Sequence, residues 1–318
     1  MSVDDLISEW ALAAGPSDRL RENENLIRFL GEWLFSDYQP YPETADFWDR
    51  LYVWLDQIDV CQTRDEDQRA MFNFIPHLMF AGQRDLTAMY RAAYDGPIRR
   101  WLVDQASLQL DDPELDERLA KLRSDTWFGS LAGMDISAFC RVNRITGQSL
   151  RPEFRFIAEF FDFANLKNQI VAKGYKRIVV VEDMIGTGEQ FMQALPALAS
   201  LGGENPIQVQ FVPLFIPPDG LHCVQTALSE KEHQHITCQP ICVLPNSAMI
   251  FRSAQADEPQ SVASFRDVIY RHGNGDFGLG DDYGTLVLSY LNCPDNLPAI
   301  IHSPWNVALF PRAPREVQ

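Results

Sequence analysis

Two adjacent acids followed by a glycine-containing loop are the residues best suited to chemistry in this sequence. Glu182 and Asp183 come directly after the apolar run Ile178–Val181, and the loop Met184–Gly188 then supplies two glycines and a threonine. Glycines let backbone N–H groups turn toward a ligand, and a helix that begins immediately after the loop adds donors and a positive dipole end. Such a loop favours an anion, and carboxylates beside it accept hydrogen bonds from a diol. The pattern therefore predicts a site for a ribose 5-phosphate.

A parallel sheet is the element expected to position these residues. Its strands are predicted at 126–131, 177–182, 207–216, 235–244 and 285–291. The helices between them are predicted at 133–143, 152–172, 187–200, 219–231 and 260–272. This alternation favours a sheet covered by helices on both faces, in which ligands bind beyond the carboxyl ends of the strands. Both acids are therefore expected to face solvent at that edge.

The first part of the chain has helical periodicity instead. Its clearest helical segments are 26–35, 47–58 and 111–123. We therefore predict a helical N-terminal region over residues 1–123 and an α/β domain over 124–318. The aromatic faces of the first region either pack into a core or dock a partner protein, and they include Trp33, Trp48 and Trp54.

Composition restricts the class of protein. The chain has 27 basic and 44 acidic residues, a net charge of −17, which disfavours strong direct DNA binding and binding to anionic membranes. The six cysteines are dispersed, as is typical of a reducing compartment. The acidic N-terminus does not resemble a signal peptide, and no apolar run reaches the roughly 18 residues of a membrane span. We expect a soluble, cytoplasmic protein without a membrane partner.

The order of strand, acid pair, loop and helix resembles the phosphoribosyl diphosphate (PRPP) signature of type I phosphoribosyltransferases. The resemblance implies an α/β fold, with a parallel-sheet phosphoribosyltransferase-like core preceded by an all-α N-terminal region. It also implies that Glu182 and Asp183 are catalytic residues that hold the ribose 2- and 3-hydroxyls. The 5-phosphate would then be wrapped by Gly186, Thr187, Gly188, Glu189 and Gln190.

Three positions depart from that signature. Gly186 stands where purine-base enzymes often have an aspartate for proton transfer, which argues against ordinary purine salvage. Glu189 stands where glycine or lysine is usual, and it would repel a phosphate unless its side chain points outward. Gln190 replaces a threonine and can still donate through its amide.

A second loop is expected to meet the diphosphate of PRPP. The segment 128–139 is the candidate, with Gly133 and Asp135 as its ligand-loop residues. Asp135 fits equally the N-cap of the following helix. Mg²⁺ is the metal that a diphosphate substrate would carry, and no intrinsic cofactor or metal is expected. The helical stretch 153–174 offers no hairpin for a flexible hood over the site.

Two further segments narrow the relationship. Residues 124–147, the acid-pair loop and residues 280–312, which include the motif Asn292–Pro298, resemble in that order a phosphoribosyltransferase-like family of bacterial conflict systems. Effectors encoded beside retron reverse transcriptases belong to that family. The resemblance covers roughly residues 124–312 and implies a role in defence against phage, as a toxin effector acting by nucleotide or nucleic-acid chemistry. It implies a phosphorylated ribose or nucleotide as ligand, and a retron reverse transcriptase with its RNA–DNA hybrid as partner.

Two functional hypotheses follow. The chain is either an enzyme acting at the anomeric carbon of a ribosyl phosphate, as a transferase or a glycosidase-like toxin, or a non-catalytic sensor of PRPP or nucleotides. Gly186 and Glu189 keep the sensor hypothesis open. Ser130, Ser137 and the six histidines show no Ser/His/Asp spacing, so no hydrolase triad is predicted.

Three other groups have alternative explanations. Zinc-type ligands occur at His233, His235, Cys238 and Cys242 without zinc-site spacing, so packed thiols in a strand are favoured over a metal site. The glycine-rich segment 273–284 is either a substrate lid or a connector. A basic cluster either meets a diphosphate or RNA backbone or pairs with acids of this chain, and it comprises Arg141, Arg144, Arg151 and Arg155.

Overall fold

The computed structural model describes residues 2–13, 19–41, 46–58, 62–109, 111–131, 134–146, 163–279, 282–303 and 307–312. The chain divides into two compact units. The terminal unit comprises Met1–Leu86 and Pro245–Gln318, and the central unit comprises Thr87–Leu244. The predicted boundary between a helical region and an α/β domain, at residues 123 and 124, falls within the central unit. The two-domain division of the sequence stays a prediction.

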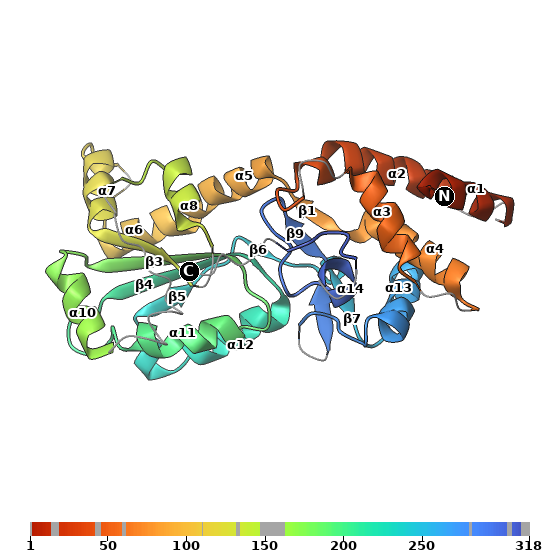
Figure 1. Cartoon of the computed structure of the whole chain (residues 1–318). Coiled ribbons are helices and arrows are strands. Elements are labelled where there is room, and N and C mark those ends of the chain that lie inside the picture. Colours follow the sequence, from red (N-terminus) through yellow and green to blue (C-terminus); the bar gives the residue numbers. More distant parts are fainter. Residues whose placement is uncertain are drawn as a thin grey trace. The chain divides into compact units, whose positions relative to one another are not determined.

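A parallel sheet forms the middle of the central unit (Figure 1). Its strand order is β2-β3-β4-β5, and β6 pairs with the carboxyl end of β4. The strands are β2 (Thr126–Ser130), β3 (Arg177–Met184), β4 (Gln208–Ile216), β5 (Ile236–Cys238) and β6 (Cys242–Val243). Ile178–Val181 are fully buried, as the uninterrupted apolar run predicts for a strand covered on both faces.

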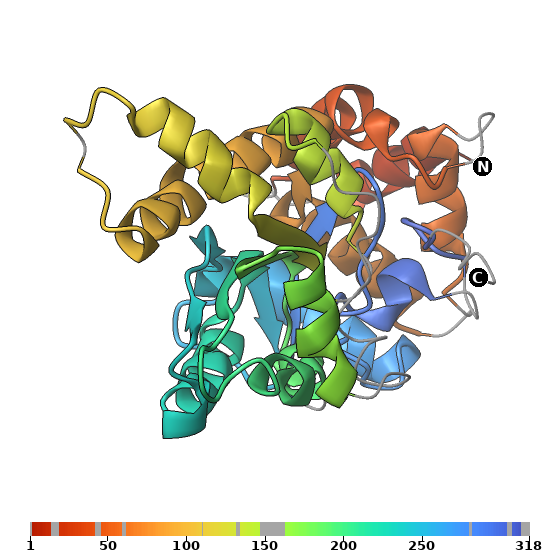
Figure 2. The same ribbon diagram turned by 90° about the vertical axis from the view of Figure 1, so that its left-hand side faces the viewer.

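Helices cover both faces of this sheet (Figures 1 and 2). On one face, α10, α11 and α12 pack on Ile178, Val180 and Phe211 of the strands. On the other face, Phe139 of α8 lies against Phe128 of β2. The helices are α5 (Gln83–Ala93), a π-helical turn (Tyr94–Ile98), α6 (Arg99–Gln105), α7 (Leu115–Ser124), α8 (Ile136–Val142), α10 (Phe163–Ala172), α11 (Glu189–Ala199), α12 (Pro218–Leu228) and the 3₁₀ turn η4 (Lys231–His233).

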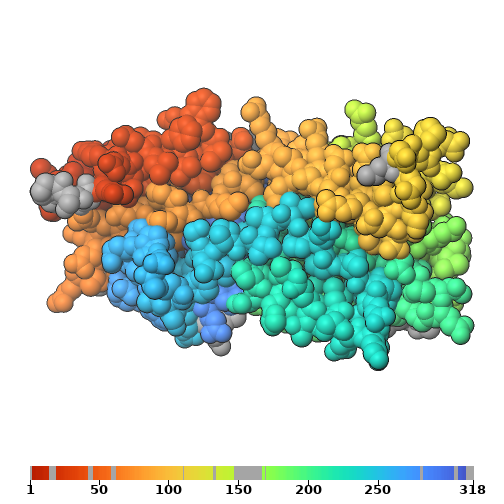
Figure 3. Space-filling view, turned by 180° about the vertical axis from the view of Figure 1, so that it is seen from behind, coloured from red at the N-terminus to blue at the C-terminus, as the bar shows by residue number. Residues whose placement is uncertain are grey.

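The terminal unit combines the N-terminal helices with the C-terminal part of the chain. Its helices are α1 (Val3–Ala13), α2 (Leu20–Trp33), α3 (Phe47–Asp56), α4 (Arg64–Phe74), α13 (Gln260–His272) and α14 (Ala299–His302), with 3₁₀ turns η1 (Phe35–Asp37), η2 (Ile75–His77) and η5 (Asn246–Ala248). Two small sheets pair β1 (Met79–Ala81) with β9 (Val287–Ser289), and β7 (Met249–Phe251) with β8 (Tyr283–Thr285). The surfaces of α4 and α13 adjoin in Figure 3, in orange and blue.

The aromatic residues singled out in the sequence have different environments in the terminal unit. Trp54 is fully buried, and its indole N–H donates to the Ile300 carbonyl at 2.8 Å. Trp33 on α2 is 67% exposed. Core packing therefore accounts for Trp54 but not for Trp33.

Two strand predictions are wrong. Residues 285–291 do not add a strand to the main sheet, because β8 and β9 pair with β7 and β1 instead. Residues 235–244 form two short strands on either side of Pro240, which has no N–H to donate to a ladder. A short apolar run is compatible with several partner strands, so periodicity alone could not decide its pairing.

None of the helices in the described ranges has both the length and the apolar character needed to span a bilayer.

Candidate functional site

The acid pair lies at the carboxyl end of β3. This strand ends two residues later than predicted, because Glu182 pairs with Pro213 and Met184 with Phe215 of β4. The Ile185 N–H then donates to the Phe215 carbonyl at 2.9 Å. The two acids are therefore held by strand geometry rather than by the loop.

Glu182 is buried, with only 1% of its surface exposed. The Leu131 N–H, just beyond the end of β2, donates to Glu182 Oε2 at 2.8 Å. The expectation that both acids face solvent is therefore wrong for Glu182. Successive side chains of a strand point to opposite faces, so only one of two adjacent acids can face a given side of the sheet.

Asp183, the next residue of β3, is half-buried. Burial raises the pKa of Asp183, while hydrogen bonds from the Glu182 side chain and the Met184 N–H act to lower it. The Met184 N–H donates to Asp183 Oδ1 at 2.8 Å. Burial thus favours the protonated form of the Asp183 carboxyl, whereas these hydrogen bonds favour its charged form.

The loop after β3 leads directly into α11. Gly188 is the N-cap of this helix, with a φ of +91°, a backbone conformation that favours glycine. The Glu189 N–H contacts Thr187 Oγ1 at 3.4 Å. The first turn of α11 has N–H groups without partners inside the helix, and they lie next to Thr187 and Gly188. This is the arrangement that the sequence predicts for an anion site.

The N-terminal half of α12 packs closely against this loop. A Cβ atom on Gly188 would lie 2.9 Å from Cys223 Sγ and 3.3 Å from the Gly220 carbonyl oxygen. A Cβ atom on Gly220 would overlap the Gly186 carbonyl oxygen. The glycines at 188 and 220 are therefore required for the close approach of helix and loop.

The two unusual residues after Gly188 have distinct environments. Glu189 is exposed, and Gln193 Nε2 donates to its Oε1 at 3.3 Å. Its carboxylate is thus held along the surface of α11, which is the outward orientation that a phosphate in the loop requires. Gln190 is half-buried.

The second loop is described only in part. Gly133 lies outside the described residues. Asp135 is exposed and caps α8, with its Oδ1 accepting from the Ser137 N–H at 2.9 Å. Its geometry is that of the N-cap alternative, and a role in binding diphosphate stays a prediction.

The zinc-type residues of the sequence have packing roles in the described structure. His233 Nδ1 lies 2.7 Å from the Ala227 carbonyl, and His235 Nε2 lies 3.0 Å from the Leu198 carbonyl. Burial raises the pKa of the Cys238 thiol to about 12, so this cysteine is a protonated, packed thiol. Among the residues that the structure describes, no three His, Cys, Asp or Glu side chains are grouped for a metal ion.

The remaining sequence candidates are placed only partly. Arg141 and Arg144 are exposed, whereas Arg151 and Arg155 lie outside the described residues. In the segment 273–284, Phe277 is fully buried and a Cβ atom on Gly278 would overlap the Leu297 carbonyl oxygen. Phe277 and Gly278 are therefore packed within the terminal unit, whereas Asn274 and Asp276 are exposed.

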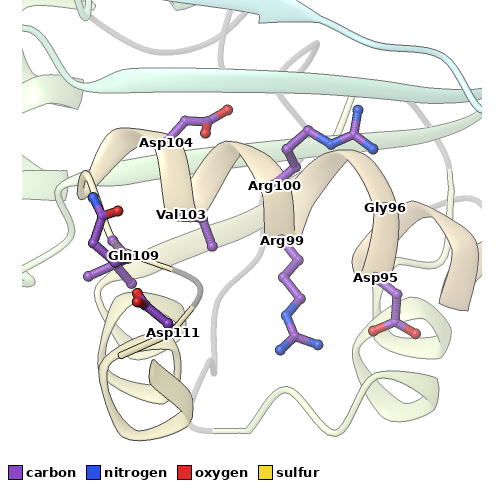
Figure 4. Close-up of a pocket in the computed structure, with 9 residues that line it drawn as sticks. Asp95, Gly96, Arg99, Arg100, Val103, Asp104, Gln109 and Asp111 are labelled. Atoms are coloured by element: carbon purple, nitrogen blue, oxygen red, sulfur yellow. The ribbon is translucent and has the colours of Figure 1, made fainter. Parts of the chain in front are cut away.

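A separate cavity of about 610 Å³ lies beside α6 in the central unit (Figure 4). The side chains of Asp95 and Arg99 extend from one side of the helix, and those of Arg100 and Asp104 extend from the opposite side. This cavity begins at the π-helical turn that contains Pro97. Its lining includes neither Glu182 nor Asp183.

Comparisons with known proteins agree with the fold. The family model described as PRTase-CE matches residues 52–312, which is more than half of the chain. Searches among curated proteins and among solved structures found no match. The match spans the parallel sheet, the acid pair, the loop before α11 and most of the C-terminal segment. This chain therefore belongs to the PRTase-CE family, whose members are phosphoribosyltransferase-like.

Proposed function

We propose that the loop between β3 and α11 binds the 5-phosphate of a ribosyl ligand, PRPP or a nucleotide, and that the chain acts at its anomeric carbon. The observation that carries this proposal is the left-handed Gly188 at the N-cap of α11, in the loop that follows the acid pair at the end of β3. The family membership supports it. We further propose that this activity serves an anti-phage defence system as an effector. This proposal rests on the resemblance of residues 124–147 and 280–312 to the phosphoribosyltransferase-like family of bacterial conflict systems.

The acids have different roles in this proposal. Asp183 is the half-buried acid, and it accepts hydrogen bonds from the ribose hydroxyls. Glu182 is occupied by the Leu131 N–H. It acts as a positioning residue that ties the start of the second loop to β3. Diphosphate departure from C1 leaves oxocarbenium-like charge on the ribose, and a carboxylate nearby stabilises that charge.

Mg²⁺ would arrive with the diphosphate rather than reside in the protein. Carboxylate oxygens are ligands that this ion prefers. Asp183 is a half-buried carboxyl residue at the end of β3, so the donor chemistry fits such an ion.

A nucleotide sensor is the second candidate function, favoured by one specific observation. Both acids are already hydrogen-bonded within the protein, Glu182 to Leu131 and Asp183 to Met184. Gly186 offers no side chain for proton transfer. A site of this kind can hold a ribose phosphate without turning it over.

Ligand-induced melting shifts test the binding site. Wild type is expected to be stabilised by PRPP and by ribose 5-phosphate but not by ribose. Asp183→Asn and Thr187→Val each remove a polar contact to the ligand, and we expect about tenfold weaker binding from each. Thr226→Val, on the exposed surface of α12, is the matched control with unchanged binding. Equal stabilisation by ribose and ribose 5-phosphate would refute a phosphate site.

Turnover separates the two candidate functions. Release of diphosphate from PRPP, or of free base from nucleotides or RNA, supports the enzyme. Binding without release supports the sensor. In a phage-plating assay of the native locus, Asp183→Asn is expected to abolish protection while Thr226→Val retains it. Full protection by Asp183→Asn would contradict the proposed role of this site in defence.

A further inference from the structure

A histidine and a serine far apart in the sequence meet in the terminal unit. His77 Nε2 lies 2.6 Å from Ser261 Oγ, a short hydrogen bond. His77 is the last residue of η2, which directly follows α4, and Ser261 lies in the first turn of α13. Because 184 residues separate the two, sequence spacing could not reveal the pair.

The two helices that present this pair are fixed against each other. Phe74 of α4 stacks on Phe265 of α13 with ring centroids 3.8 Å apart. The buried Asp67 of α4 accepts hydrogen bonds from Arg271 and from His272, the latter at 2.8 Å. Contacts in the middle and at the C-terminal end of α13 therefore hold this helix, and with it Ser261, in place relative to α4 and the η2 turn that carries His77.

The chemistry of the pair suits proton transfer from serine to histidine. Burial lowers the pKa of His77, so the imidazole is neutral near pH 7. In the tautomer with its proton on Nδ1, His77 accepts the Ser261 proton on Nε2. Ser261 also lies at the positive end of a 13-residue helix, where the Val262 and Ala263 N–H groups donate to the Pro259 carbonyl at 3.0 and 3.1 Å. The positive end of the helix dipole can stabilise negative charge that develops beside Ser261.

Both side chains line a cavity of about 900 Å³. This volume is within the range of small-molecule sites. The cavity is lined by as many acids as arginines, namely Glu66, Asp67, Asp267, Arg19, Arg69 and Arg271. With no excess of either charge, it suits a neutral ligand better than a polyanion.

We propose that Ser261 and His77 are the nucleophile and general base of a second site, which hydrolyses a neutral ester through an acyl-serine. His77 Nε2 takes the Ser261 proton as Oγ bonds to the ester carbonyl carbon. The bond to the alcohol oxygen then breaks, and the alcohol leaves with the proton from His77. Water attacks the acyl-serine and its proton returns through His77 to Oγ, which releases the carboxylic acid.

A fluorophosphonate probe tests this proposal on the full-length chain. In its reaction, Ser261 Oγ displaces fluoride from phosphorus, and peptide mapping by mass spectrometry identifies the modified residue. We expect labelling on the peptide that contains Ser261. Because the mapping uses wild type, it does not depend on whether any variant folds.

Variants then separate a nucleophile from a structural hydrogen bond. Ser261→Ala is expected to abolish labelling, and His77→Asn to slow it by about 10²-fold or more. Ser264→Ala is the matched control, because Ser264 lies one turn further along α13 and is hydrogen-bonded by Gln260 rather than by a histidine. We expect it to label like wild type, and to hydrolyse p-nitrophenyl acetate at the same rate.

Two results would overturn the proposal. One is the absence of label on Ser261 in wild type at probe concentrations that modify a known serine hydrolase. The other is labelling of Ser261 at a rate unchanged by His77→Asn in a variant that retains the wild-type melting temperature. In either case the pair is only a structural tie between η2 and α13. PRPP binding in the central unit is measured separately and does not depend on this result.

Discussion

Replacing Gly188 with alanine tests the packing beneath the proposed phosphate loop. An alanine here meets two costs. The left-handed backbone, with φ at +91°, costs about 1–2 kcal/mol for a residue with a Cβ atom. The new Cβ would also lie 2.9 Å from Cys223 Sγ and 3.0 Å from Cys223 Cβ, closer than ordinary carbon contacts. Overpacking of this kind costs roughly 1–3 kcal/mol.

Gly203→Ala is the matched control for this substitution. Gly203 has a similar φ of +83°, but a Cβ atom there would have nothing within 4 Å. The backbone cost is therefore shared, and the difference between the two variants isolates the contact with Cys223. If crowding costs about 2 kcal/mol, Gly188→Ala melts about 4–8 °C below Gly203→Ala in calorimetry of the full-length chain.

Cys223→Ala in the Gly188→Ala background is expected to recover part of this loss. It removes Sγ but leaves the Cys223 Cβ position 3.0 Å from the new methyl group. Equal melting temperatures for Gly188→Ala and Gly203→Ala would refute the close packing of α12 on the loop. A substitution at Gly188 is thus expected to reduce stability as well as ligand binding, because its side chain points toward α12.

Three other perturbations give measurable outcomes. Glu182→Ala leaves the buried Leu131 N–H without its acceptor, so the free energy of unfolding falls by about 1–3 kcal/mol in urea titrations, whereas Glu182→Gln, which keeps an acceptor oxygen, loses less. Burial acts to raise the pKa of Asp67, but hydrogen bonds from Arg271, His272 and Thr63 outweigh it and lower this pKa. The folded carboxyl therefore stays charged at pH values where the unfolded one takes up a proton. Wild type therefore loses stability as the pH falls from about 5 to 3, a loss that Asp67→Asn lacks. Because the pKa of Cys238 is raised to about 12, its alkylation rate in the native protein rises about tenfold per pH unit between pH 8 and 10, and a plateau near pH 9 would contradict its burial.

The buried strand of the parallel sheet and the bounds of the helix at 260–272 agree with the structure because their signals are local, although that helix belongs to the terminal unit and not to the unit of the sheet. The apolar run Ile178–Val181 and the helical spacing of residues 260–272 depend on neighbours in the sequence, and α13 begins and ends at the predicted residues. Residues 285–291 show the opposite case. Their strands pair with β1 and β7, and no pattern within the segment could specify those partners.

The candidate site likewise has features that sequence order predicts and features that depend on a neighbouring strand. The acid pair, the glycine loop and the helix after it follow one another along the chain, so their order alone predicts a cradle for an anion. Whether each acid faces a ligand depends on a neighbouring strand. Glu182 is buried because Leu131, 51 residues earlier, places its N–H against the carboxylate.

The sequence by itself determined the α/β class, the strand that carries the acid pair and the loop that precedes α11. These features rest on periodicity and on the conformational demands of glycine, which act over a few residues. Only the tertiary structure decided that Gly188 lies against Cys223, that Glu182 is engaged by Leu131, and that His77 meets Ser261. Such contacts arise when helices and strands pack, and packing joins residues that no sequence interval relates.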